Sequence, residues 1–203
     1  MVSVGKGLAE AQSVKWLRSA KFGGYKKMVL PIAYMAPKEW YRAYLTCPEE
    51  VEIEGLESFE KQTCRNRCLI TGPDGVLTLS VPVKKVEHKQ LTKDIEISYQ
   101  SRWQHQHWIS LVSAYKHTPF FDYYAEFFKP FYEKEYKFLW DYNNEIHQTI
   151  MALLMNSPKR VEGFAYKATG DWRNEELNRW FGDGRSILDE LFEFGNETRY
   201  RLE

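Results

Sequence analysis

Two arginines, Arg65 and Arg67, lie two positions apart in a run from Thr63 to Thr71 that alternates apolar and polar side chains. Alternate residues of a β-strand point to the same face, so both guanidiniums are expected on one polar face. A planar guanidinium can hold a phosphate or a carboxylate through two parallel hydrogen bonds. The spacing therefore predicts an anion-binding site, and a solvated sheet face with surface ion pairs is the alternative.

His107 is the residue best suited to act as a general base, because an imidazole changes its charge near neutral pH. It follows Trp103 by one helical turn, on a strip of a predicted helix that adjoins the core. A hydrogen-bonded histidine at the edge of the core is the alternative. Tyr34 and Lys61, near the starts of predicted strands, are further polar candidates.

No metal site or cofactor is expected from the motifs. Cys64 and Cys68 are about 13 Å apart if they lie on one strand, too far to share a zinc ion, so both are expected in the core. His105 and His107 would point about 200° apart on a helix. The sequence also contains no phosphate-binding glycine loop, no serine nucleophile elbow and no Cys-x-x-Cys or His-Glu-x-x-His motif.

A β-hairpin must position the two arginines. Two alternating runs, 63–71 and 76–83, flank the turn sequence Gly72-Pro-Asp-Gly75. Pairing Thr71 with Val76 puts Ile70 opposite Leu77 and places an apolar face on one side of the hairpin. The arginines should then project from the other face.

Strands dominate the first half of the chain and helices the second. The fold class expected is α/β or α+β, with a mixed β-sheet that has a central hairpin, helices packed on it and a helical C-terminal half. Ser186 and Asp189 have the spacing of a capping box, and Thr118 with Pro119 resembles a helix start. The further strands are expected over 28–35, 50–54 and 94–98, and the helices over 38–45, 102–116, 119–131, 138–156, 172–181 and 187–194.

Composition favours one folded domain. The 203 residues include 28 basic and 28 acidic side chains, a balance that argues against a nucleic-acid partner. Residues 1–27 are expected to form a basic leader before a single domain over 28–203. No uncharged run approaches the roughly 20 apolar residues of a membrane span, and three cysteines fit a reducing, cytoplasmic setting. The aromatic seam over 120–132 is expected in the core or at a homodimer surface, and a sugar-stacking platform is the alternative.

Several ordered motifs resemble the WbqC-like family of bacterial proteins over about residues 28–195. The most specific is the stretch Lys61-Gln-Thr-Cys-Arg-Asn-Arg-Cys68, which runs into Leu79-Ser-Val-Pro-Val83 and is followed by Trp103 and His107-Trp108. The other motifs are Leu30-Pro-Ile-Ala-Tyr34, Ala114-Tyr115, Pro119-Phe-Phe121, Tyr123-Tyr124 and Ser186-Ile-Leu-Asp189.

The resemblance implies a cytoplasmic protein of surface-polysaccharide (O-antigen) biosynthesis, possessing a transferase activity that moves glycine or another acyl group to a nucleotide-linked amino sugar. His107 would be the base and Asn66 an oxyanion donor. A nucleotide-sugar or an activated donor would be the anionic substrate. The residues expected to bind it are Lys61, Arg65, Arg67, Tyr34, Tyr115 and Trp103. The alternative is a non-catalytic binding or assembly protein that recognises an anionic sugar intermediate.

Two positions depart from the pattern of the family. Gln106 stands before the motif histidine where many relatives have lysine. Gly184-Arg185-Ser186 stands where relatives often have Pro-Asn-Leu-Ser. Because of the second difference, we do not expect this loop to share a role with the same loop in relatives.

Overall fold

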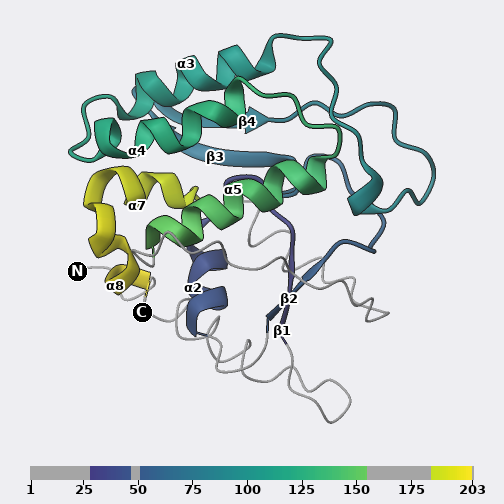
Figure 1. Cartoon of the computed structure of the whole chain (residues 1–203), viewed down its shortest axis with the longest axis horizontal. Coiled ribbons are helices and arrows are strands. Elements are labelled where there is room, and N and C mark those ends of the chain that lie inside the picture. The colour runs from purple at the N-terminus through teal and green to yellow at the C-terminus, as the bar shows by residue number, and fades with distance from the viewer. Residues whose placement is uncertain (1–27, 47–50, 155–183, 203) are drawn as a thin grey trace, which may run out of the picture.

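The computed structural model describes residues 28–46, 51–154 and 184–202. The predicted basic leader over 1–27 and the helix predicted over 172–181 lie outside these ranges. Within them the chain is a mixed α/β protein whose C-terminal half is helical, so the predicted fold class is confirmed. Figure 1 shows α3 (Trp103–Tyr115) and α4 (Phe121–Phe128) side by side near a β-hairpin, and α5 (Leu139–Leu154) lower in the same view.

The hairpin consists of β3 (Arg67–Gly72) and β4 (Gly75–Ser80). Its antiparallel register pairs Thr71 with Val76 and Ile70 with Leu77, as the alternation of apolar residues predicted. Gly75 has a φ of 120°, a backbone conformation that side chains rarely adopt, which explains why glycine ends the turn.

The hairpin is a two-stranded sheet, and isolated bridges join other segments to β3 and to the chain that follows β4. On the β3 side, Leu69 pairs with Arg185 in parallel, and the Ser186 amide donates to the Leu69 carbonyl at 2.8 Å. On the β4 side, Val83 pairs with Ile97. A second, two-stranded sheet joins β1 (Met28–Pro31) in parallel to β2 (Val51–Glu54).

The helices begin and end close to where their periodicity predicted, with one exception. Thr118 does not cap the next helix, because its hydroxyl donates to the Tyr115 carbonyl and closes the preceding one. In the described ranges no helix has the length and apolar character needed to cross a membrane. The α-helices are α2 (Lys38–Thr46), α3 (Trp103–Tyr115), α4 (Phe121–Phe128), α5 (Leu139–Leu154), α7 (Ile187–Phe194) and α8 (Thr198–Leu202), and the 3₁₀ turns are η1 (Thr92–Asp94), η2 (Lys129–Tyr132) and η3 (Gly195–Glu197).

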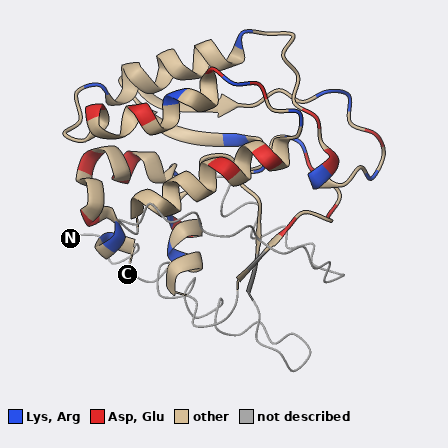
Figure 2. Cartoon of the chain, viewed as in Figure 1, with Lys and Arg blue, Asp and Glu red and all other residues tan. Residues whose placement is uncertain are grey.

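The two faces of the hairpin differ in burial. Cys68 and Ile70 are buried on the face that α3 covers, and Cys68 is a free thiol, as expected. Arg67 and Leu69, on the opposite face, are only half-buried. Figure 2 shows basic and acidic residues interspersed over the helices and connecting segments, in keeping with the balanced net charge. The half-buried face of β3 therefore carries the Arg67 guanidinium without being part of a broad basic surface.

The buried stripe of α3 differs from the one predicted. The fully buried residues are spaced by four and include Trp103 and His107, which had been expected beside the core. The neighbouring Trp108 is only half-buried. Tertiary packing is the reason, since the Trp103 ring lies against Tyr142 of α5 with centroids 5.7 Å apart.

Candidate functional site

Arg65 lies in a turn before β3 and does not share a face with Arg67. Its side chain is 2% exposed. Its Nε and Nη2 donate to the two carboxylate oxygens of Glu57, both at 2.5 Å, and Nη1 donates to the Thr63 hydroxyl at 3.1 Å. Burial alone would lower the pKa of Arg65, but the hydrogen bonds and charge of Glu57 raise it overall. The prediction of one shared polar face was wrong, because the alternation of the strand begins only at Arg67.

Asn66 is a buried residue that ties this turn to the chain following β4. Its Nδ2 donates to the Val81 carbonyl at 3.1 Å, and its Oδ1 accepts from the Gln62 amide at 3.2 Å. The Val81 amide in turn donates to the Asn66 carbonyl at 2.8 Å. Both ends of the Asn66 amide are thus engaged, so an oxyanion role would require it to release a structural hydrogen bond.

The structure brings Tyr34, Trp103 and His107 together in the core. The Trp103 ring packs edge-on against the His107 ring with centroids 5.1 Å apart. The Tyr34 hydroxyl lies 3.0 Å from His107 Nδ1 and 3.0 Å from the Tyr132 hydroxyl. A hydrogen bond to the backbone of Ser80 also acts on the imidazole. The hydroxyls of Tyr34 and Tyr132 thus form a hydrogen-bonded chain that holds the imidazole in place.

His107 is uncharged at neutral pH. Burial lowers its pKa to about 4, against the smaller opposite effect of the hydrogen bond to Ser80. Burial likewise lowers the pKa of His147, on α5, to about 3. Within the structure these two imidazoles therefore behave as neutral polar groups of the core.

The depressed pKa values predict a loss of stability in mild acid. Between about pH 6.5 and pH 4 the unfolded chain binds a proton at His107 that the folded chain does not. The free energy of unfolding should therefore decrease by about 1.4 kcal/mol for each pH unit of acidification and for each such histidine. Urea unfolding at several pH values measures this slope. His107→Gln should reduce it, whereas His105→Gln, at an exposed position of the same helix, should not; equal slopes in the two variants would contradict the assignment.

Tyr115 forms a link between α3, β3 and α7 through Asp189. Its hydroxyl donates to Asp189 Oδ1, and the carboxylate also accepts from the Thr71 amide at 3.1 Å and from the Thr71 hydroxyl at 2.5 Å. Burial, followed by the charge of Asp189, raises the pKa of Tyr115. Ser186 caps α7 as predicted, with its hydroxyl accepting from the Leu188 amide. Of the predicted binding residues, Lys61 is exposed at the turn before β3.

Arg67 has a neighbour that sequence reasoning missed, namely Arg185. Residues paired across strands project from the same face, so Arg185 shares the face of Leu69, and Arg67 precedes Leu69 by two positions. We call Arg67, Leu69 and Arg185 the arginine face. The positions opposite Arg67 and Leu69 on β4 are Ser80 and Thr78, which add hydroxyl groups and no carboxylate to this face.

The two guanidiniums of the arginine face have unused donors. Arg67 Nε and Arg185 Nη1 are buried without a hydrogen-bond partner, and neither side chain forms an ion pair in the ranges that the structure describes. Buried polar groups are nearly always satisfied, so such donors indicate a place for an ion, a water molecule or a ligand. Diagonal neighbours in a sheet lie about 7–8 Å apart, a spacing across which long side chains can reach the same ligand.

The remaining chemistry of the described residues is limited. No group of three or more histidine, cysteine, aspartate or glutamate side chains within those ranges is arranged to hold a metal ion. Arg65, Arg67 and His107 do not form one site, since Arg65 is paired with Glu57 and His107 is buried on the opposite side of the hairpin from Arg67. The arrangement can bind an anion at the arginine face.

Comparison with known proteins gives one match. The model of the WbqC-like protein family matches residues 55–178, which is more than half of the chain. Searches of curated proteins and of solved structures gave no significant match. The matched region includes Arg67 and His107, whereas Tyr34, Arg185 and Asp189 lie outside it.

Proposed function

Because the chain belongs to the WbqC-like protein family, whose members are associated with polysaccharide biosynthesis, we propose that it acts in the cytoplasm in making bacterial surface polysaccharide and binds a nucleotide-linked sugar there. The diphosphate would bind at the arginine face. The observation that carries the proposal is the pair of unpartnered donors on Arg67 and Arg185.

The chemistry of a diphosphate matches these two residues. Its oxygens carry full negative charge and accept the paired, parallel hydrogen bonds that a guanidinium donates. A ligand that satisfied both buried donors would remove the free-energy cost of leaving them unpaired. Ser80 and Thr78 would supply further donors to the phosphate or to the sugar. Recognition of the diphosphate needs no residue that the fold already uses for its own stability.

Acyl transfer to an amino sugar is the second candidate function, and the hydrogen-bonded chain of His107, Tyr34 and Tyr132 favours it. A neutral imidazole with an acceptor nitrogen can take a proton, and the two tyrosine hydroxyls could carry it. His107→Gln separates the two functions, since it should lower turnover about a hundredfold or more in a transferase and leave ligand binding near normal in both cases. The binding function has the stronger support, because the nitrogens of His107 and Asn66 are already engaged.

A thermal-shift experiment tests the proposed function. UDP-N-acetylglucosamine should raise the melting temperature of the wild-type chain, because a ligand that binds only the folded state stabilises it by mass action. Uridine and N-acetylglucosamine, which lack the diphosphate, should leave the melting temperature unchanged. An equal shift with uridine would mean that the nucleoside and not the diphosphate is recognised, and would contradict the proposal.

A further inference from the structure

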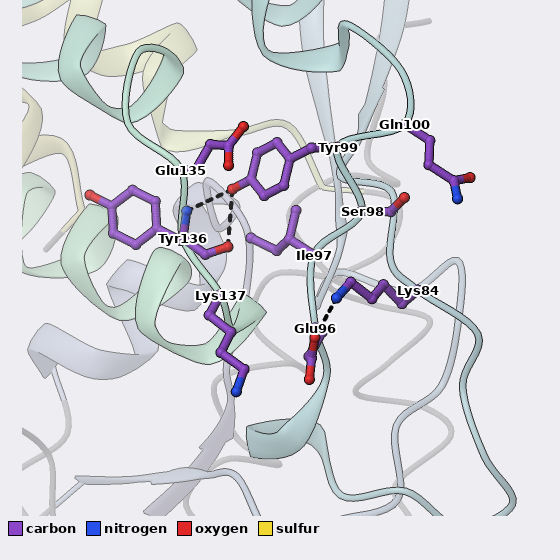
Figure 3. A pocket seen from close by; sticks show the side chains of 9 residues that line it. All are labelled: Lys84, Glu96, Ile97, Ser98, Tyr99, Gln100, Glu135, Tyr136 and Lys137. Atoms are coloured by element: carbon purple, nitrogen blue, oxygen red, sulfur yellow. Dashed lines mark hydrogen bonds and ion pairs between the residues drawn. The ribbon is translucent and has the colours of Figure 1, made fainter.

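Beyond the end of β4, the chain pairs with the segment around Ile97 through an isolated bridge at Val83. A cleft with a volume of about 530 Å³ opens there between residues 96–100 and residues 135–137 (Figure 3). Its volume falls within the range of small-molecule sites. Arg185 adjoins β3 and does not line this cleft, which is therefore separate from the arginine face.

The walls of the cleft are held together by hydrogen bonds. The Ile97 amide donates to the Lys137 carbonyl at 3.0 Å. The Tyr99 hydroxyl donates to the Tyr136 carbonyl at 3.1 Å and accepts from the Tyr136 amide at 2.7 Å, as the dashed lines in Figure 3 show. Tyr136 is itself anchored in the core, with its ring 5.1 Å from that of Tyr142. A ligand would therefore meet a preformed surface, which reduces the entropy lost on binding.

The lining divides into two ends of different chemistry. Figure 3 shows Lys84, Glu96 and Lys137 at one end. The Lys84 ammonium is paired with Glu96 at 2.6 Å, whereas Lys137 forms no ion pair within the described part of the chain and lies over the Phe138 ring at 4.8 Å. This end thus holds two ammonium groups and one carboxylate, whereas the whole lining, which includes Glu135, holds two of each.

The other end carries neutral and acidic hydrogen-bonding groups. Ser98, Tyr99, Gln100 and Glu135 lie there in Figure 3. A hydroxyl and an amide both donate and accept, and a carboxylate accepts, so together they match the hydroxyl groups of a sugar. The half-buried Tyr99 ring offers an apolar surface of the kind that a sugar ring can cover.

We propose that this cleft binds a single pyranose that carries an anionic substituent. The hydroxyl groups of the sugar contact Ser98, Gln100 and Glu135, and the anion contacts Lys137. A carboxylate at the sugar and a phosphate at the sugar share this chemistry. The proposal goes beyond the diphosphate site and does not depend on the arginine face.

Titration calorimetry with three sugars tests the proposal. D-glucuronate or D-glucose 1-phosphate should bind the wild-type chain about tenfold or more tightly than D-glucose does, and the tighter of the two identifies the anion. Lys137→Ala should weaken binding of that anionic sugar about tenfold and leave binding of glucose unchanged. Lys129→Ala, which makes the same change in net charge on η2 outside the cleft, is the matched control and should have no effect.

Three results would overturn the proposal. They are binding of glucose as tight as that of both anionic sugars, an unchanged affinity in Lys137→Ala, or no heat of binding from any of the three sugars at millimolar concentration. In Arg67→Ala, which lacks one guanidinium of the arginine face, the anionic sugars should still bind the cleft more tightly than glucose does. Failure of this site is thereby distinguished from failure of the diphosphate site, which Arg67→Ala should impair.

Discussion

Replacing Arg65 with alanine is expected to lower the free energy of unfolding by about 3–5 kcal/mol, the cost of breaking a buried ion pair by removing one partner. The guanidinium is almost fully buried, and Glu57 is itself only 21% exposed on its side chain. The substitution leaves the Glu57 carboxylate without its two donors and removes the bond from Nη1 to Thr63. Urea unfolding monitored by circular dichroism measures the loss.

Arg67→Ala is the matched control, since it removes the same side chain two positions along the chain. Arg67 forms no ion pair in the part of the chain that the structure describes, so its loss should cost at most about 1 kcal/mol. The ratio of the losses in free energy of unfolding in the two variants tests the difference between Arg65 and Arg67. Equal losses would mean that Arg65 and Arg67 have the same role and that the division between a structural and a binding arginine is wrong.

The local part of the fold could be predicted from the sequence. Alternation of apolar residues on both arms of the hairpin, with a four-residue turn between them, fixed the register that pairs Thr71 with Val76. The burial of Cys68 follows from the same alternation. Helix periodicity likewise located α3, but two adjoining stripes of this helix were both candidates for the buried face. Contacts with rings distant in the sequence, such as that of Tyr142 with Trp103, decide which stripe is buried.

The composition of the site could be predicted only in part. Arg67 was identified from its strand, but Arg65 was assigned to the same face because the sequence does not show where the strand begins. Arg185 was missed because its pairing with Leu69 joins segments more than one hundred residues apart. One local feature pointed to Arg185, namely its position in a segment that departs from the family pattern. A single arginine in a loop does not show which strand it pairs with.

The second large effect is expected in ligand binding. Arg67→Ala and Arg185→Ala should each weaken binding of UDP-N-acetylglucosamine about tenfold or more, because a hydrogen bond to a charged group contributes about 1.5–3 kcal/mol. Both variants should keep near wild-type stability, since neither guanidinium holds another part of the described chain. Arg42→Ala is a suitable control, because the Arg42 side chain, on α2, donates to backbone carbonyls of α8 among the described residues.

Isothermal titration of UDP-N-acetylglucosamine into the wild-type chain and into Arg67→Ala, Arg185→Ala and Arg42→Ala tests the central claim most directly. The arginine face predicts measurable binding by the wild type and by Arg42→Ala, and a loss of about tenfold or more in each of the other two variants. Wild-type affinity in both Arg67→Ala and Arg185→Ala would contradict the claim that these two guanidiniums form the anion site.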